Sequence, residues 1–198
     1  MFKIASLPFA RQHTLLVVLI CLISSLAFIF DKQVSWLFIY NRDLISQGEV
    51  WRIFTGHFLH TNGYHLLLNL SAILLLWALH GQFYQYVSYT FLFIITALTT
   101  SVGLYIFSTD LHQYVGLSGV LHGVFIFGAL MDIKNKDKTG YLLFIGVWLK
   151  IADEQYSGAS QDVAELIGAN IAIDAHLWGA IGGLLFSLSY LLYQRIKT

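Results

Sequence analysis

The chain has 198 residues, of which 57% are hydrophobic and only 11% are charged, and this balance excludes an ordinary water-soluble domain. Eleven basic residues equal eleven acidic ones, and no basic run is interleaved with aromatic residues, so no nucleic-acid partner is expected. The expected partners are the lipid bilayer and proteins embedded in it. The one cysteine, Cys21, excludes an intrachain disulfide.

Six apolar stretches are predicted to cross the membrane as helices. Five have close to the 20 mostly apolar residues, give or take a few, that a crossing needs. The stretch at 140–152 is shorter, and Lys150 would snorkel from near its end. The predicted fold is therefore all-α, a polytopic membrane bundle in one domain, 1–198, with spans at about 14–30, 64–79, 85–107, 115–131, 140–152 and 171–193.

The first stretch has a second interpretation. Residues 1–30 could form a secretory signal peptide, because Ser25-Leu26-Ala27 resembles a small-residue cleavage site. An uncleaved first helix is the favoured interpretation, and cleavage would leave five spans. The loop at about 31–63 is rich in aromatic residues and reads as an interfacial segment, for which the aromatic belt of membrane proteins is the default explanation.

Basic residues indicate the orientation of the spans. Lysines at 134, 136 and 138 precede the stretch at 140–152, and Arg195 and Lys197 close the chain. Both clusters can lie in the cytoplasm only if an even number of spans separates them, so 140–152 crosses together with 171–193. Lys3 and Arg11 place the N-terminus in the cytoplasm as well. Both termini are therefore expected to be cytoplasmic.

With this orientation, the second, fourth and sixth spans all begin at the outer face. Polar groups within membrane helices are costly, so each is a functional candidate. Three polar clusters fall in these first turns: His65 with Asn69, the run Gly116-Leu117-Ser118-Gly119, and His176 followed by Gly179, Gly182 and Gly183. Their common depth predicts one site.

The residue types of this site fit acyl transfer. Ser118 at a helix start is a candidate nucleophile, and a neutral His176 could take its proton. His65 and Asn69 could donate to the developing oxyanion together with the backbone N–H of Ser118. Asp174 is two residues from His176 and points to another side of the helix. No carboxylate is expected beside the histidine, so the predicted unit is a Ser–His dyad.

Other interpretations remain open at this point. The glycines could serve only close helix packing, and His65 with Asn69 could only join helices by hydrogen bonds. Histidines at 65, 122 and 176, with 57 and 60 as further ligands, could instead bind haem or a metal. Neither interpretation explains why nucleophile, base and donors share one depth.

Four motifs resemble signatures of the rhomboid intramembrane serine proteases, in the family's order and over nearly the whole chain. They are Trp51-Arg52, His65-x-x-x-Asn69, Gly116-x-Ser118-Gly119 and His176-x-x-Gly179-x-x-x-Gly183. The resemblance implies a six-helix fold, the catalytic roles given above and no cofactor or metal. It also implies a loop with Trp51 and Arg52 that dips sideways into the bilayer.

His122 departs from the pattern of many rhomboids, which carry a tyrosine four residues after the serine. With the small size, this is similar to the bacterial rhombosortase subgroup, which implies cleavage of Gly-Gly-containing transmembrane tails of exported proteins at the outer face of the cytoplasmic membrane. His122 could compete as base, but we expect it to pack against or orient His176. A non-catalytic helix binder would need neither Ser118 nor His176. Residues expected to support the site are Gly116, Gly119, His122, Gly179 and Gly183.

Overall fold

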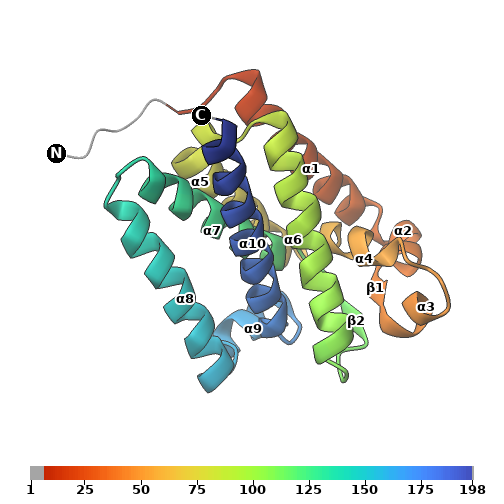
Figure 1. Ribbon diagram of the computed structural model, residues 1–198. Coiled ribbons are helices and arrows are strands. Elements are labelled where there is room, and N and C mark those ends of the chain that lie inside the picture. The colour runs from red at the N-terminus through yellow and green to blue at the C-terminus, as the bar shows by residue number, and fades with distance from the viewer. Residues whose placement is uncertain (1–6, 198) are drawn as a thin grey trace.

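The computed structural model describes residues 7–197, which form a mostly helical bundle (Figure 1). Its α-helices are α1 (Arg11–Ile29), α2 (Asp31–Phe38), α3 (Arg42–Ser46), α4 (Arg52–Thr55), α5 (Gly63–His80), α6 (Tyr86–Phe107), α7 (Ser118–Lys134), α8 (Thr139–Ser157), α9 (Gln161–Ile167) and α10 (Ile173–Lys197). Two 3₁₀ turns, η1 (Gly56–Phe58) and η2 (Gly81–Phe83), follow α4 and α5. Two short strands, β1 (Tyr40–Asn41) and β2 (Gln113–Tyr114), pair antiparallel.

Each predicted span corresponds to a long helix, but not every one has the character of a full crossing. Four helical stretches among the described residues are long and apolar enough to span a membrane: α1, α5 with η2, α6 and α10. Helix α7 has only 17 residues, and α8 carries Lys150, Asp153 and Glu154. The helical membrane character is confirmed, whereas the count of six spans stays a prediction.

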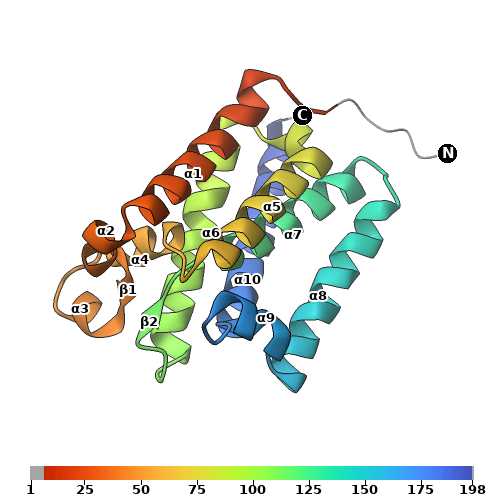
Figure 2. The ribbon, with the colours of Figure 1, turned by 180° about the vertical axis from the view of Figure 1, so that it is seen from behind.

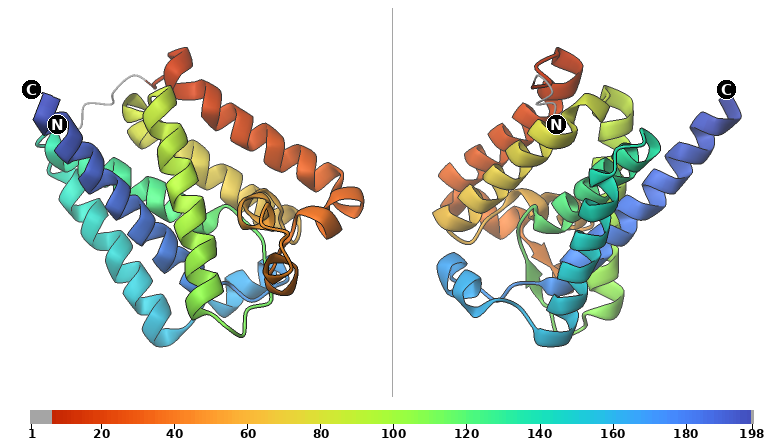
Figure 3. Two further views of the ribbon diagram at one scale, coloured as in Figure 1. Left: turned by 45° about the vertical axis from the view of Figure 1, so that its right-hand side comes forward. Right: turned by 90° about the vertical axis from the view of Figure 1, so that its left-hand side faces the viewer.

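Helix α7 is the centre of the bundle, and α8 stands at its edge. Eleven residues of α7 are buried, and α5, α6, α8 and α10 all pack against it. Val120, Val124 and Phe127 of α7 belong to the main apolar core. Helix α8 buries only Gly140, Val147 and Ile151, and it lies on the outside of α7 and α10 (Figure 3).

Two predicted helix boundaries are wrong, and glycines explain both. Helix α7 begins at Ser118 rather than at 115, because Gly116 has a φ of +118°, which a helix cannot contain. Helix α8 does not end at 152 but continues to Ser157, before Gly158 with a φ of +87°. Glu154, which was expected in a loop, therefore lies on a helix.

The segment between α1 and α5 forms a side unit beside α6 (Figure 2). Arg52 is 2% exposed, donates to the carbonyls of Trp36 (3.1 Å) and Ile39 (3.0 Å), and pairs with Glu49. Trp51 is 43% exposed. Arg52 is thus an internal clamp of this loop, and of these two residues Trp51 is the exposed one.

Glycines bring α7 and α10 into backbone contact. A Cβ placed on Gly119 would lie 2.8 Å from the carbonyl oxygen of Ala175, and one on Gly179 would collide with the carbonyl of Gly119. Gly183 faces Gly123 in the same way one turn further on. Small residues allow membrane helices to approach this closely. The packing interpretation of these glycines is therefore correct, and the contact also sets the relative positions of Ser118 and His176.

Candidate functional site

Ser118 and His176 meet where α7 and α10 begin. Ser118 is the first residue of α7, and His176 lies in the first turn of α10. The Nε2 atom of His176 is 3.0 Å from the Oγ atom of Ser118. The imidazole is buried, with 6% of the residue exposed. The predicted nucleophile and base are thus within hydrogen-bond reach, the geometry that proton transfer between them requires.

A carboxylate stands on the other side of the imidazole, and the prediction that none would do so is wrong. Oε2 of Glu154 is 2.8 Å from Nδ1 of His176. Asp174 has a different role, because its carboxylate accepts hydrogen bonds from Ser108 (2.6 Å) and Gln155 (3.2 Å). A sequence signal for Glu154 existed: it stands four residues after Lys150, the i,i+4 spacing of a helical ion pair.

Lys150 joins this cluster. Its Nζ atom lies 2.7 Å from Oε1 of Glu154, 2.9 Å from Nε2 of His122 and 3.2 Å from Nδ1 of His176. The ligand atoms of His122, Glu154 and His176 lie within 4.8 Å of one another, a spacing at which three such side chains could hold a metal ion. The ammonium group contacts all three residues, so a cation already occupies the position a metal would take.

His122 lies flat against the base. The two rings have centroids 4.1 Å apart and an interplanar angle of 20°. Nδ1 of His122 is 2.7 Å from the carbonyl oxygen of Ser118, which can only accept, so this nitrogen carries the ring proton and Nε2 accepts from Lys150. The hydroxyl of Ser118 contacts His176 rather than His122. The expected packing of His122 on His176 is what the structure contains.

His65 and Asn69 lie on one face of α5, across from Gly116. A Cβ on Gly116 would be 2.7 Å from Nε2 of His65 and 3.9 Å from Nδ2 of Asn69, so a side chain there would fill the space in front of both groups. Nδ2 of Asn69 also donates to the carbonyl of His65 at 3.0 Å. Nδ1 of His65 lies 3.1 Å from Oγ1 of Thr61 and 3.4 Å from its backbone nitrogen, and Nε2 faces Gly116.

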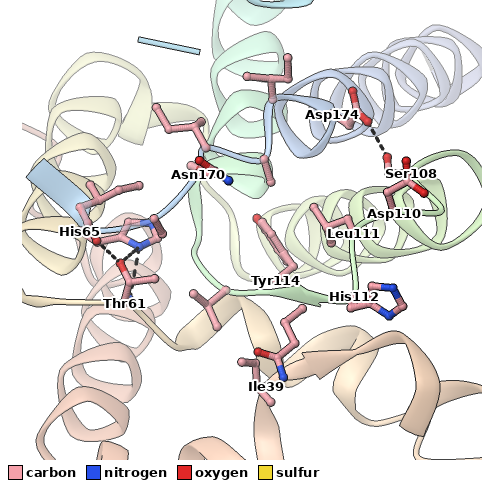
Figure 4. A pocket seen from close by; sticks show the side chains of 18 of the residues that line it. Ile39, Thr61, His65, Ser108, Asp110, Leu111, His112, Tyr114, Asn170 and Asp174 are labelled. Carbon is pink, nitrogen blue, oxygen red and sulfur yellow. Dashed lines mark hydrogen bonds between the residues drawn. The ribbon is translucent and has the colours of Figure 1, made fainter. Parts of the chain in front are cut away.

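A cavity of about 760 Å³ opens beside these groups, and Figure 4 shows His65 and Thr61 on one side of it and Ser108 with Asp174 on the other. Ser118 lies in its wall. The segment from α9 to α10 forms part of the cavity and is tethered to the start of α5, because Thr61 donates to the carbonyl of Ile167 at 2.6 Å. Ser118 therefore borders an open space of this size.

Two comparisons show what the chain is similar to. The sequence matches the model of the Rhomboid domain over residues 47–193. It is also 26% identical, over 153 residues, to a protein of Bacillus subtilis (strain 168) named "Putative rhomboid protease YdcA", an alignment that covers 76% of this chain and 71% of that protein. The residues of the candidate site all fall within the matched domain.

Proposed function

The chain belongs to the rhomboid family, and on this premise we propose that it is an intramembrane serine endopeptidase with Ser118 as nucleophile and His176 as general base. The observation that carries the proposal is the 3.0 Å separation of Ser118 Oγ and His176 Nε2 across two helices that are in backbone contact. Members of this family are generally intramembrane serine proteases. The membrane-embedded character of the helices agrees with that activity.

The proposed reaction has two stages. Ser118 Oγ forms a bond to the scissile carbonyl carbon while its proton passes to Nε2 of His176. The C–N bond then breaks as Nε2 returns that proton to the leaving amine, which leaves an acyl-enzyme. Water, or an amine, attacks the ester and restores the serine hydroxyl by the same proton route in reverse.

Negative charge develops on the substrate oxygen in both stages. We assign its stabilisation to the imidazole of His65, the amide of Asn69 and the backbone N–H of Ser118. The support is the space beside Gly116, which both α5 side chains face. Donors aimed at the developing charge from fixed positions are the largest single contribution in many enzymes of this type.

The proposed setting is a single domain, 1–198, with six spans in the bacterial cytoplasmic membrane. Both termini would face the cytoplasm, and the cavity would open near the outer face. The charge distribution supports this, since Lys134 is in the last turn of α7 and Arg195 in the last turn of α10. The C-terminal end of α10 lies opposite α9 in the bundle (Figure 1). Helix α8, with its small buried surface, is the proposed lateral gate.

The proposed substrates are membrane-anchored proteins with a Gly-Gly-containing transmembrane tail. An intact helix hides its carbonyls in internal hydrogen bonds, and glycine is the residue that unwinds a helix most readily apart from proline. The stacking of His122 on His176 supports assignment to the rhombosortase subgroup, because this position is what separates the chain from many other rhomboids.

Cleavage of a reporter with a Gly-Gly tail tests the proposal. Ser118→Ala and His176→Ala are expected to lower kcat by at least about 10⁴-fold relative to wild type. Ser189→Ala is the matched control, because its hydroxyl contacts only the carbonyl of Leu185 within α10. Undiminished cleavage by either site variant rules out the catalytic pair. Equal cleavage of a reporter without Gly-Gly rules out the tail specificity alone.

A further inference from the structure

We infer that Glu154 is the positioning carboxylate of the site, which fixes the ring and the proton of His176, and that Lys150 anchors it. The inference rests on the proposed function, because it assigns a role in that reaction. It extends the Ser–His pair to a triad of side chains on three helices: Ser118 on α7, His176 on α10 and Glu154 on α8.

Both oxygens of the Glu154 carboxylate are engaged. Oε2 contacts Nδ1 of His176 at 2.8 Å, and Oε1 contacts Nζ of Lys150 at 2.7 Å. The carboxylate is 12% exposed and the lysine 46% exposed. A side chain held at both oxygens has little freedom to rotate, so Lys150 keeps Oε2 pointed at the imidazole. Lys150 is held in turn by Nε2 of His122.

This arrangement selects one tautomer of His176. An ionised carboxylate can only accept hydrogen bonds, so the 2.8 Å contact is a donation from Nδ1–H, and the 3.2 Å approach of Lys150 Nζ to the same nitrogen is then not a hydrogen bond. Nε2 then presents its lone pair to the hydroxyl of Ser118, which is the arrangement that a general base needs. With a neutral amide at position 154, the other tautomer also finds a partner, and Nε2–H would then point at Ser118 and could not take its proton.

The carboxylate also acts after the proton has moved. Once Nε2 has taken the proton of Ser118, the ring is an imidazolium with one proton on each nitrogen. Glu154 compensates that charge through the Nδ1–H bond and does not itself take the proton. The charged or titratable groups around the ring are Glu154, Lys150, His122 and His65, and only Glu154 is negative. Removing it leaves the imidazolium facing an ammonium.

The origin of Glu154 on α8 has a consequence for access. Helix α8 is the least buried of the helices that contact α7, so it is the one that separates from the bundle at the smallest cost. Movement of α8 away from α10 would break the Nδ1–Oε2 bond and leave His176 without its fixed tautomer. The base is thus fully arranged only when α8 is closed against α10.

Kinetics of the full-length protein in proteoliposomes, with the Gly-Gly reporter, test the inference. Glu154→Gln is expected to lower kcat about 10²- to 10⁴-fold with KM almost unchanged, as for other carboxylates that orient a catalytic histidine. Glu154→Asp should recover part of that loss, because it restores the acceptor at a longer distance. Lys150→Met should lower kcat less than Glu154→Gln, since it frees the carboxylate without removing it.

The pH–rate profile separates positioning from a purely structural role. In Glu154→Gln the acid limb of kcat is expected to shift to lower pH, because the imidazolium loses its negative partner. Asp153→Asn removes a neighbouring carboxylate that contacts only Ser157, and it should leave both kcat and the profile unchanged. Thermal unfolding of each variant shows whether a lost rate reflects lost structure.

The outcomes distinguish this inference from the proposed function. Absence of cleavage by wild type, with no labelling of Ser118 by a serine-reactive probe, overturns the proposed function. Cleavage by wild type together with equal kcat and equal pH profiles for Glu154→Gln and Asp153→Asn overturns the role of Glu154 alone. A fall in kcat with an unshifted profile and an equally lowered melting temperature also overturns it, because that result is structural.

Discussion

A histidine–carboxylate pair lies near each end of α7, and only one of the two pairs is arranged for chemistry. Following the proposed orientation, we call the end at Ser118 the outer end and the end at Lys134 the inner end. At the outer end, His176 contacts Glu154 at 2.8 Å through Nδ1 and Ser118 at 3.0 Å through Nε2. At the inner end, His80 contacts Asp132 at 3.0 Å through Nε2. The second nitrogen of His80 has no hydrogen-bond partner among the described residues.

The difference lies in what surrounds each pair. His80 is 1% exposed, and a Cβ on Gly128 would collide with its ring, so no substrate can approach. The outer pair borders a hydroxyl, a cavity and two further donors. A buried histidine–carboxylate pair therefore contributes only to stability, unless the other ring nitrogen of the histidine contacts a nucleophile that borders a cavity. This comparison yields three predictions, beginning with the largest effect.

The largest expected effect is at the two side chains of α5 near the outer pair, His65 and Asn69. His65→Ala or Asn69→Ala is expected to lower kcat of reporter cleavage about 100- to 1,000-fold, because each removes one group aimed at the developing oxyanion. Leu67→Ala, on the exposed side of the same helix, is the control. Unchanged kcat in both donor variants would mean that the space beside Gly116 is not the oxyanion site.

At the inner end the expected effect is on stability instead. His80→Leu or Asp132→Leu should lower the free energy of unfolding by about 1–3 kcal/mol, because each leaves a buried polar partner unsatisfied. Reporter cleavage below the melting temperature should stay within about twofold of wild type. Thermal unfolding in detergent and kcat measured on the same samples check both statements. A large loss of kcat in a stably folded variant would contradict the comparison.

His57 is a third buried histidine, and it has no carboxylate partner within residues 7–197. It should make the free energy of unfolding depend on pH. Its Nε2 donates to the carbonyl of Ala97 at 3.1 Å, and burial lowers its pKa from 6.5 to about 4. Between about pH 6.5 and 4 the unfolded chain binds more protons than the folded one, so stability falls as pH falls through this window. Through His57, the free energy of unfolding should fall by about 1 kcal/mol between pH 7 and pH 5.5.

The measurement is the melting temperature across this pH range for wild type and His57→Gln, which keeps a donor but does not titrate. The slope should be smaller in the variant. Equal slopes would contradict the prediction, because they would mean that the folded protein offers protonated His57 a second hydrogen-bond acceptor.

Much of the bundle could be predicted because membrane helices follow apolar runs. The depth argument also led to Ser118, His176, His65 and Asn69, since polar residues in apolar helices are rare enough to be informative. The glycine contacts explain why two of these residues come together: the same residues that permit close packing of α7 and α10 lie beside Ser118 and His176. Packing and chemistry were offered as alternatives, and the packing occurs beside the residues that we propose for the chemistry.

Glu154 escaped prediction for a physical reason. Counting apolar residues ends a span near its first charges, so the predicted span ends at 152 and Glu154 falls in the loop after it. The backbone continues in helical form to Ser157, because residues 150–157 contain neither glycine nor proline. The partners of Arg52 could not be predicted for a related reason, since its carbonyl and Glu49 contacts form only after the loop has folded.

The backbone contact between α7 and α10 also suggests how this protein tolerates change over evolution. Because Gly119 and Gly179 touch through main-chain atoms, the distance from nucleophile to base depends on helix register rather than on side-chain volume. Substitutions on the lipid-facing surfaces of α1 or α5 can therefore accumulate without moving the pair. A single residue inserted between His176 and Gly179 would instead turn the imidazole by about 100° around α10. Sequence length in this short stretch should be far less free to drift than sequence identity elsewhere.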